Sequence, residues 1–391
     1  MSLKKPFKVA VVACLALLLV TVPILGVGCT SNPASPSGEG LKVGLSICYT
    51  GVAAEKGRPM GNGKLDCIKY INEELGGVSG HPIEVIWRDN EYDTSKAVTI
   101  INELISKGCL MFTTNSSKMM GASMEIANRA SFPGFSVFSS PILTHPPKHI
   151  YAQMPDYGDD WAAFTEYYLD NVWQGSGKPK MALHLLNNTT GYGARDAAKA
   201  LADQLGVEIV ATEEHTATTI SEVESLTRIK ALNPDILYIS STPQPTSIIV
   251  KNAAELGMDI PIGCGHASFT DVLVELAGAD AEGVYGVFPT VNWYDDVPAM
   301  DKMVEYCKAN HPDDEGSMDY MTCWAEGLII AEILRLAIEN AGVENLTPQA
   351  VEEYGFQKLD NFDVGGLHGP ASYTPGDNRL SKSRYLMARV I

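Results

Sequence analysis

The chain has 391 residues, and 47 acidic against 29 basic residues give it a formal net charge of −18. Apolar residues make up 45% and charged residues 19%, which is typical of a globular protein and excludes a largely disordered or collagen-like chain. Nucleic-acid binding needs a basic surface to neutralise phosphates, so this composition excludes a nucleic acid as the expected partner.

The N-terminus has the pattern of a secretory signal. Three lysines within the first eight residues precede an apolar run over residues 9–28, which ends at Cys29. Gly28 followed by Cys29 is similar to a lipoprotein processing box. We therefore expect residues 1–28 to be a lipoprotein signal peptide and Cys29 to be lipidated. An uncleaved transmembrane anchor is the alternative, because about 20 apolar residues can span a bilayer.

The next segment, residues 29–40, is small, polar and rich in Pro and Gly, as in a flexible tether. Both interpretations of the N-terminus place residues 41–391 outside the cytoplasm, in the periplasm or on the outer face of the cell membrane. No second long apolar segment follows, which argues against a channel or permease. The remaining cysteines show no metal-binding spacing. Cys307 and Cys323 are the nearest pair for a disulfide, and isolated buried thiols are the alternative.

Strand and helix patterns then alternate in a first series. Short apolar runs predict strands, and apolar residues at helical spacing predict helices. Predicted strands cover 42–47, 83–87, 109–112 and 135–138, and predicted helices cover 65–75, 97–105 and 118–130. We expect a glycine-containing loop over 49–61.

A second series follows, and two long helices come after it. Predicted strands cover 181–186, 207–212, 236–240, 260–263 and 284–288, and predicted helices cover 161–173, 194–205, 222–232, 250–256, 272–277, 298–310 and 319–341. Two successive β/α series predict two doubly wound parallel sheets. Such sheets bind ligands at the carboxyl ends of their strands, so loops that follow strands hold the candidate site residues.

Two of these loops belong to the first series. Asn115, Ser116 and Ser117 follow a strand and open a helix, where free N–H groups and the helix dipole favour an anion such as a carboxylate. Simple helix capping is the alternative. Phe138 and Ser139 combine an aromatic ring with a hydroxyl, as small-molecule pockets do, and a plain turn is the alternative.

Three more candidates belong to the second series. Tyr192 lies between two glycines, and Thr242 and His266 follow later strands. A histidine in the position of His266 is more often a hydrogen-bonded surface or core residue than a ligand contact. Catalytic motifs for serine hydrolases, zinc proteases and phosphate-binding loops are absent from the sequence, which predicts neither an enzyme nor a cofactor or metal site.

Several segments resemble the branched-chain amino-acid-type, Leu/Ile/Val-binding-protein-like, periplasmic binding proteins. The matching residues lie in 41–89, 109–141, 191–193 and 361–377. The resemblance implies the α/β type I periplasmic binding fold, with two doubly wound parallel-sheet lobes joined by a three-crossover hinge. Its lobes are expected at 41–153 plus 291–369 and at 154–290 plus 370–391.

The resemblance also implies a function. Proteins of this family capture a small solute between their lobes and deliver it to the permease and ATPase subunits of an ABC importer, without catalysis. The lipid anchor would hold this chain at the membrane. The alternatives are a ligand sensor for a membrane receptor and an extracytoplasmic α/β enzyme.

Carried over residue by residue, the resemblance places Ser116 on the family's carboxylate-binding serine. Phe138 and Ser139 fall on the second loop of the first lobe, and Tyr192 on the tyrosine of the second lobe. Thr242 and Lys56 fall where pocket aromatics are common.

One departure from the family pattern concerns the ligand. Gly265 and His266 lie where amino-acid binders of this family commonly carry an acid that holds the ligand's ammonium. A buried ammonium without a partner is costly, so this departure predicts a carboxylate or amide that lacks the amine. Lys56 or His266 would then pair with extra negative charge.

Overall fold

The computed structural model of the protein describes residues 36–380 and 386–389. The predicted signal peptide, Cys29 and residues 29–35 of the predicted tether lie outside this range. Among the described residues, no helix has both the length and the apolar character needed to cross a bilayer.

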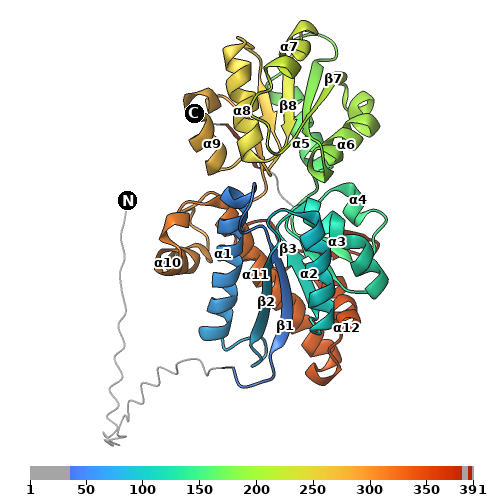
Figure 1. Ribbon diagram of the computed structural model, residues 1–391, viewed down its shortest axis with the longest axis vertical. Coiled ribbons are helices and arrows are strands. Elements are labelled where there is room, and N and C mark those ends of the chain that lie inside the picture. The colour runs from blue at the N-terminus through green and yellow to red at the C-terminus, as the bar shows by residue number, and fades with distance from the viewer. Residues whose placement is uncertain (1–35, 381–385, 390–391) are drawn as a thin grey trace, which may run out of the picture. The chain divides into compact units, whose positions relative to one another are not determined.

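Five parallel strands form the first sheet, in the order β2-β1-β3-β4-β5. Figure 1 labels β1, β2 and β3 of this sheet. They are β1 (Leu41–Ile47), β2 (Ile83–Asp89), β3 (Met111–Thr114), β4 (Gly134–Ser136) and β5 (Ile150–Ala152). The helices between them are α1 (Ala54–Glu73), α2 (Thr94–Ser106), α3 (Ser117–Ala130) and α4 (Pro141–Thr144). The central strands are almost wholly buried, as expected for a sheet covered on both faces.

The second sheet has the order β13-β10-β9-β8-β6-β7, in which β13 is antiparallel to β10 and the other strands are parallel. Its strands are β6 (Lys180–Leu186), β7 (Glu208–His215), β8 (Ile236–Ser240), β9 (Ile262–Cys264), β10 (Tyr285–Phe288) and β13 (Leu386–Arg389). Its helices are α5 (Tyr157–Asn171), α6 (Thr189–Leu205), α7 (Val223–Ala231), α8 (Pro243–Glu255) and α9 (Asp271–Ala277), the last followed by the short helix η1 (Gly278–Ala281).

The chain then returns to the first sheet. This part contains α10 (Met300–Asn310), η2 (Pro312–Asp314), α11 (Met318–Ala341), η3 (Val343–Asn345), α12 (Pro348–Tyr354), η4 (Phe356–Lys358) and the hairpin of β11 (Tyr373–Thr374) and β12 (Asp377–Leu380). Trp324 of α11 and Phe356 share one buried core with Val43 of β1. We call the first sheet with α1–α4 and α10–α12 the first lobe, and the second sheet with α5–α9 the second lobe.

Three crossings connect the lobes: from β5 to α5, from β10 to α10, and from β12 to β13. The sequence placed the third crossing near residue 370. In the structure, Tyr373 and Leu380 still pack in the first lobe's core, and the Tyr373 hydroxyl donates a 2.8 Å hydrogen bond to the Ala152 carbonyl. The third crossing therefore follows Leu380.

Two helices, α1 and α6, start earlier in the chain than the sequence predicts. The expected loop over 49–61 ends early, because α1 starts at Ala54, and α6 starts at Thr189 rather than after residue 193. The glycines in these segments serve close packing. A Cβ at Gly57 would lie 1.9 Å from the Cys48 carbonyl oxygen, so only glycine fits there.

All six described cysteines are free and buried. Cys307 packs in the main core of the first lobe, whereas Cys323 belongs to a separate cluster with Phe138 and Tyr157. The alternative of isolated buried thiols therefore holds for Cys307 and Cys323.

Candidate ligand site

A cavity of about 30 Å³ lies where loops at the carboxyl ends of the first sheet's strands meet the starts of second-lobe helices. We call it the principal cavity. Six of the nine predicted ligand residues line it: Lys56, Asn115, Ser116, Ser117, Phe138 and Thr242. Tyr92, Tyr157 and Thr190 also line it, and the sequence analysis did not select them.

The start of α3 forms one wall of the principal cavity. Ser116 is its N-cap, with an extended backbone and a side-chain oxygen that accepts a hydrogen bond from the Met119 N–H at 3.4 Å. Ser117 is the first helical residue. The first N–H groups of a helix lack intrahelical acceptors, so this end offers donors to a bound group.

Other helices also begin at the principal cavity. Tyr157 opens α5, Thr190 lies in the first turn of α6, and Thr242 is the N-cap of α8. Lys56 lies in the first turn of α1. Within residues 36–380 and 386–389, it is the one charged residue that lines the cavity, and no Asp or Glu of these ranges lines it. Helix N-termini carry partial positive charge, so this wall favours an anion.

Hydroxyl groups at the cavity link the two lobes. The Ser117 hydroxyl lies 3.1 Å from the Tyr157 hydroxyl, and the Thr189 hydroxyl donates to Ser117 Oγ at 3.1 Å. Asn188 donates to the Tyr92 hydroxyl at 3.3 Å. Burial raises the pKa of Tyr157, so its phenol stays protonated. The Ser117 contacts join α3 to α5 and α6, and the Asn188 contact joins the N-terminus of α6 to the loop after β2.

Asn115 has a bracing role at the cavity wall. Its side-chain oxygen accepts from the Cys48 N–H, and its amide donates to the Gly57 carbonyl, both at 3.1 Å. Because both ends of the amide are engaged, Asn115 holds the loop after β1 against α1.

Phe138 lies between a cation and a second ring. The Lys56 ammonium is 4.7 Å from the centre of the Phe138 ring, and the His266 ring stacks on Phe138 with centroids 5.1 Å apart. Lys56 is also ion-paired with the buried carboxylate of Asp319. Burial raises the pKa of Asp319 to about 6, and Lys56 opposes that rise.

Three predicted residues lie elsewhere. Ser139 is fully buried, and its carbonyl accepts from the Tyr157 N–H at 3.2 Å. Tyr192 is half-buried, and the Arg195 guanidinium lies 4.1 Å from its ring centre. The His266 Nδ1 lies 2.6 Å from the Asp160 carboxylate, and the imidazole lines a neighbouring cavity instead.

Some of the residues at the two cavities that the sequence analysis did not select could have been predicted from their place after a strand, and others could not. Tyr92 follows strand β2, so the rule that selected Ser116 would also select it. Thr190 follows strand β6, so the same rule would select it too, whereas Tyr157 opens α5 after the crossing from β5, which is a weaker signal. Asp319 and Asp160 follow no strand, and the sequence gives no sign that they approach Lys56 and His266.

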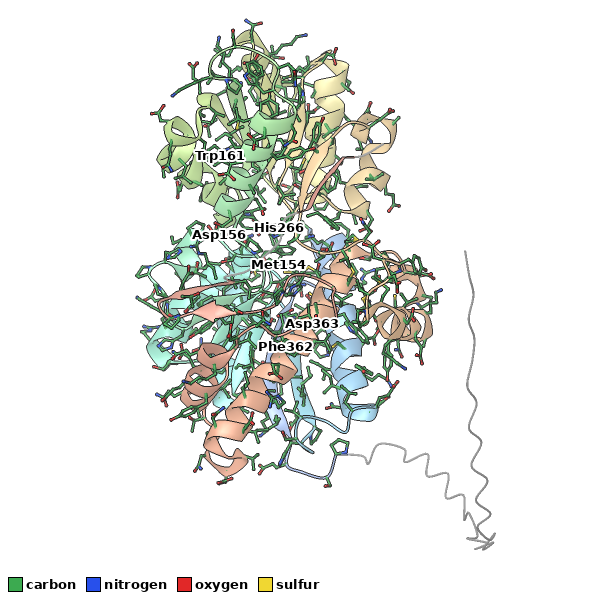
Figure 2. All side chains as sticks on the ribbon, turned by 180° about the vertical axis from the view of Figure 1, so that it is seen from behind. Met154, Asp156, Trp161, His266, Phe362 and Asp363 are labelled. Atoms are coloured by element: carbon green, nitrogen blue, oxygen red, sulfur yellow. The ribbon has the colours of Figure 1, made fainter. Side chains whose placement is uncertain are left out.

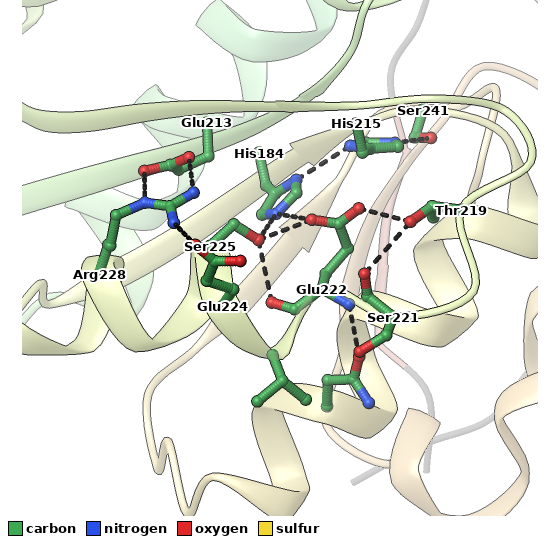
Figure 3. A network of polar contacts seen from close by, with 12 residues as sticks. His184, Glu213, His215, Thr219, Ser221, Glu222, Glu224, Ser225, Arg228 and Ser241 are labelled. Atoms are coloured by element: carbon green, nitrogen blue, oxygen red, sulfur yellow. Dashed lines mark hydrogen bonds and ion pairs between the residues drawn. The ribbon is translucent and has the colours of Figure 1, made fainter.

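A buried polar network lies in the second lobe (Figure 3). His184 Nδ1 and His215 Nδ1 are 2.9 Å apart, and His215 Nε2 lies 2.7 Å from the Ser241 hydroxyl. His184 Nε2 lies 3.4 Å from the Glu222 carboxylate. Ser241 directly precedes Thr242, so the network supports the loop that carries a cavity residue.

Comparison with known proteins gives one family. A family model described as "Periplasmic binding protein" matches residues 40–390. The chain is 21% identical to the leucine-, isoleucine-, valine-, threonine-, and alanine-binding protein of Pseudomonas aeruginosa, over 87% of this chain and 93% of that protein. It is 24% identical to an amino acid binding protein of the same species, over 63% of this chain and 66% of that protein.

Solved structures share the fold. A branched chain amino acid ABC transporter protein from Thermus thermophilus, with bound valine, has a TM-score of 0.80 at 20% identity, covering 90% of this chain and 94% of that one. A fatty acid ABC transporter substrate-binding protein from Thermomonospora curvata has a TM-score of 0.76 at 22% identity, covering 86% of this chain and 85% of that one. At these identities the likeness shows the fold alone.

Proposed function

The chain belongs to the periplasmic binding protein family, and on that premise we propose that it captures a small organic anion by its carboxylate and delivers it to an ABC permease. It does so without catalysis, as an extracytoplasmic lipoprotein anchored through Cys29. Its membrane partners are the permease and ATPase subunits. A ligand that touches both lobes binds the closed arrangement better and shifts the population toward it.

The observation that carries this proposal is the charge of the principal cavity. The starts of five helices contribute lining residues and supply the positive potential, because Lys56, the one charged side chain among the described lining residues, is already paired with Asp319. Each helix N-terminus stabilises a nearby anion by about 0.3–1 kcal/mol, while an ammonium placed there would meet the same ends unfavourably. Ser116 and Ser117 add hydroxyl donors at the start of α3.

The named ligands of the structural relatives fit this chemistry. One relative holds valine, and another is named as a fatty acid carrier. Both kinds of solute carry a carboxylate, but a fatty acid has no ammonium. The absence of an acid from the lining of the principal cavity favours the second kind of solute for this chain.

A catalytic role has little support at the cavity. Ser241 and His215 form a hydroxyl–imidazole contact of 2.7 Å, which is a geometry that nucleophiles use. Neither residue lines the principal cavity, and Ser241 and His215 are 1% and 4% exposed. A solute in the cavity would not reach that hydroxyl.

The proposal is tested by calorimetric titration of the mature chain with short carboxylates, their methyl esters and the matching α-amino acids. We expect the plain carboxylates to bind and the esters to fail. Ser116→Gly should weaken carboxylate binding at least about tenfold, because a hydrogen bond to a charged group contributes about 1.5–3 kcal/mol. Glycine costs an N-cap position only a few tenths of a kcal/mol, so the fold is retained.

Ser139→Ala is the matched control. Ser139 is a buried serine on the neighbouring loop that does not line the cavity, so its replacement should leave the affinity unchanged. Tight binding of α-amino acids with no binding of plain carboxylates would contradict the proposed solute class.

A further inference from the structure

Three buried polar atoms face a second, smaller cavity of about 20 Å³, which we call the second chamber. His266 Nε2, Thr270 Oγ1 and Asp319 Oδ2 have no hydrogen-bond partner within the described part of the chain. All three residues line the second chamber and are at least nine-tenths buried. Buried polar groups are normally paired, so three such atoms on residues that line one chamber point to a site for a polar group.

The second chamber adjoins the principal cavity. Phe138 lines both, and Asp319 of the second chamber is ion-paired with Lys56 of the principal cavity. His266, which follows β9 of the second lobe, and Asp319 of α11 in the first lobe both line the second chamber, and so does Met154 on the crossing from β5 to α5. Figure 2 labels His266 and Met154. A solute whose carboxylate lies at the start of α3 would therefore reach the second chamber past the Phe138 ring.

Asp319, the one acid among the described residues that line the second chamber, already has a cation beside it. It is ion-paired with Lys56, whereas Asp160 does not line the chamber and lies 2.6 Å from the His266 Nδ1. An ammonium placed there would add a buried positive charge next to Lys56, which is strongly unfavourable. The occupant is therefore neutral and must donate a hydrogen bond to Asp319.

The size of the chamber selects among neutral groups. A space of about 10–15 Å³ holds one water molecule, so this chamber has room for about one oxygen atom with its hydrogen. A hydroxyl can donate to Asp319 and accept from the Thr270 hydroxyl. Phe269, Phe288 and Met318 supply apolar walls that would exclude bulk water.

Resting on the proposed function, we infer that the second chamber binds a hydroxyl group of the solute, so that the protein selects hydroxylated carboxylates. The carboxylate lies at the start of α3, and the hydroxyl lies among His266, Thr270 and Asp319. The hydroxyl thereby lies in a chamber that residues of both lobes line.

The test compares straight-chain carboxylates of increasing length that end in a methyl, a hydroxyl or an ammonium group, titrated into the mature chain and into Thr270→Val. At one chain length, we expect the hydroxyl compound to bind at least about tenfold tighter than its methyl counterpart. Thr270→Val should abolish this preference and leave binding of the methyl compound unchanged. The variant breaks no internal hydrogen bond, because the Thr270 hydroxyl has none.

Thr144→Val is the matched control, since its hydroxyl is also buried and unpaired but lines neither cavity. It should keep the hydroxyl preference. Equal binding of the methyl and hydroxyl compounds, or tightest binding of an ammonium compound, would contradict hydroxyl binding in the second chamber. Neither result would contradict carboxylate capture. Failure of every carboxylate would overturn both. A crystal structure of the complex with an ordered water only in the chamber would also overturn the inference.

Discussion

His215 is a histidine whose surroundings oppose its protonation. It is 4% exposed, and burial together with the neighbouring His184 lowers its pKa to about 3. Burial also acts to raise the pKa of Glu222, but hydrogen bonds from His184, Ser225 and Thr219 outweigh it and lower that pKa to about 2. Both residues therefore bind fewer protons in the folded chain than in the unfolded chain at mildly acidic pH.

The pH dependence of stability follows from the sign of these shifts. Below its ordinary pKa of about 6.5, His215 takes up a proton in the unfolded chain but not in the folded chain, so stability falls as pH falls. We expect His215 to account for a loss of about 2–3 kcal/mol between pH 7 and about pH 4.5. Glu222 adds a further loss below about pH 4.5. Urea unfolding across this pH range measures the effect.

The control for this prediction uses a second histidine. His215→Gln should flatten the stability profile between pH 7 and about pH 4.5, whereas His81→Gln, at a partly exposed site in the first lobe, should keep it. A profile that stays unchanged in His215→Gln would show that other groups cause the acid sensitivity.

At the scale of elements, helix α1 shows both what the sequence predicts and where it misleads. The apolar spacing correctly predicted its second half, but residues 49–61 with their glycines were predicted to form a loop. In the structure the glycines of α1 allow close backbone contact: Gly57 packs on the Cys48 carbonyl oxygen, and a Cβ at Gly63 would lie 2.1 Å from the Tyr320 carbonyl oxygen of α11. A local pattern cannot reveal a neighbour that lies far along the chain, so propensity gave the wrong start for α1.

Gly63→Ala should destabilise the protein even though alanine favours helices. The gain in helix propensity is about 1 kcal/mol, but the added Cβ forces α1 and α11 apart at a cost of about 1–3 kcal/mol or more. Gly121→Ala in α3 is the control, because its nearest contact would be an ordinary 3.6 Å to Thr189. We expect Gly121→Ala to be neutral or stabilising by up to about 1 kcal/mol in urea unfolding. Equal effects of both variants would contradict this account.

At the scale of the whole molecule, most of the β/α order was predictable, whereas β5, the C-terminal strands β11–β13 and the completed site were not. Two β/α series predicted two parallel sheets, and the rule of strand carboxyl ends located Ser116, Phe138 and Thr242. The rule could not find Asp319, because it lies on α11, which returns to the first lobe through the second crossing. Contacts that complete the site arise from this return of the chain, and only three-dimensional packing specifies them.

The contacts between the lobes give a prediction about closure. Thr189 of α6 donates to Ser117 Oγ of α3 at 3.1 Å, yet Thr189 does not line the principal cavity. Thr189→Val therefore removes a link between the lobes without removing a residue that lines the cavity. One such hydrogen bond contributes about 0.5–1.5 kcal/mol, so carboxylate affinity should fall by roughly two- to tenfold.

Thr227→Val is the control for this prediction, because the Thr227 hydroxyl donates to the Val223 carbonyl within α7 and joins no second element. It should leave the affinity unchanged. Calorimetry measures both affinities, and small-angle scattering with and without ligand reports compaction. If Thr189→Val bound the carboxylate as tightly as the parent chain, the Thr189–Ser117 contact would not contribute to the closed state. A loss of affinity with normal compaction at saturating ligand would show that the ligand's own contacts with both lobes are sufficient to close the protein.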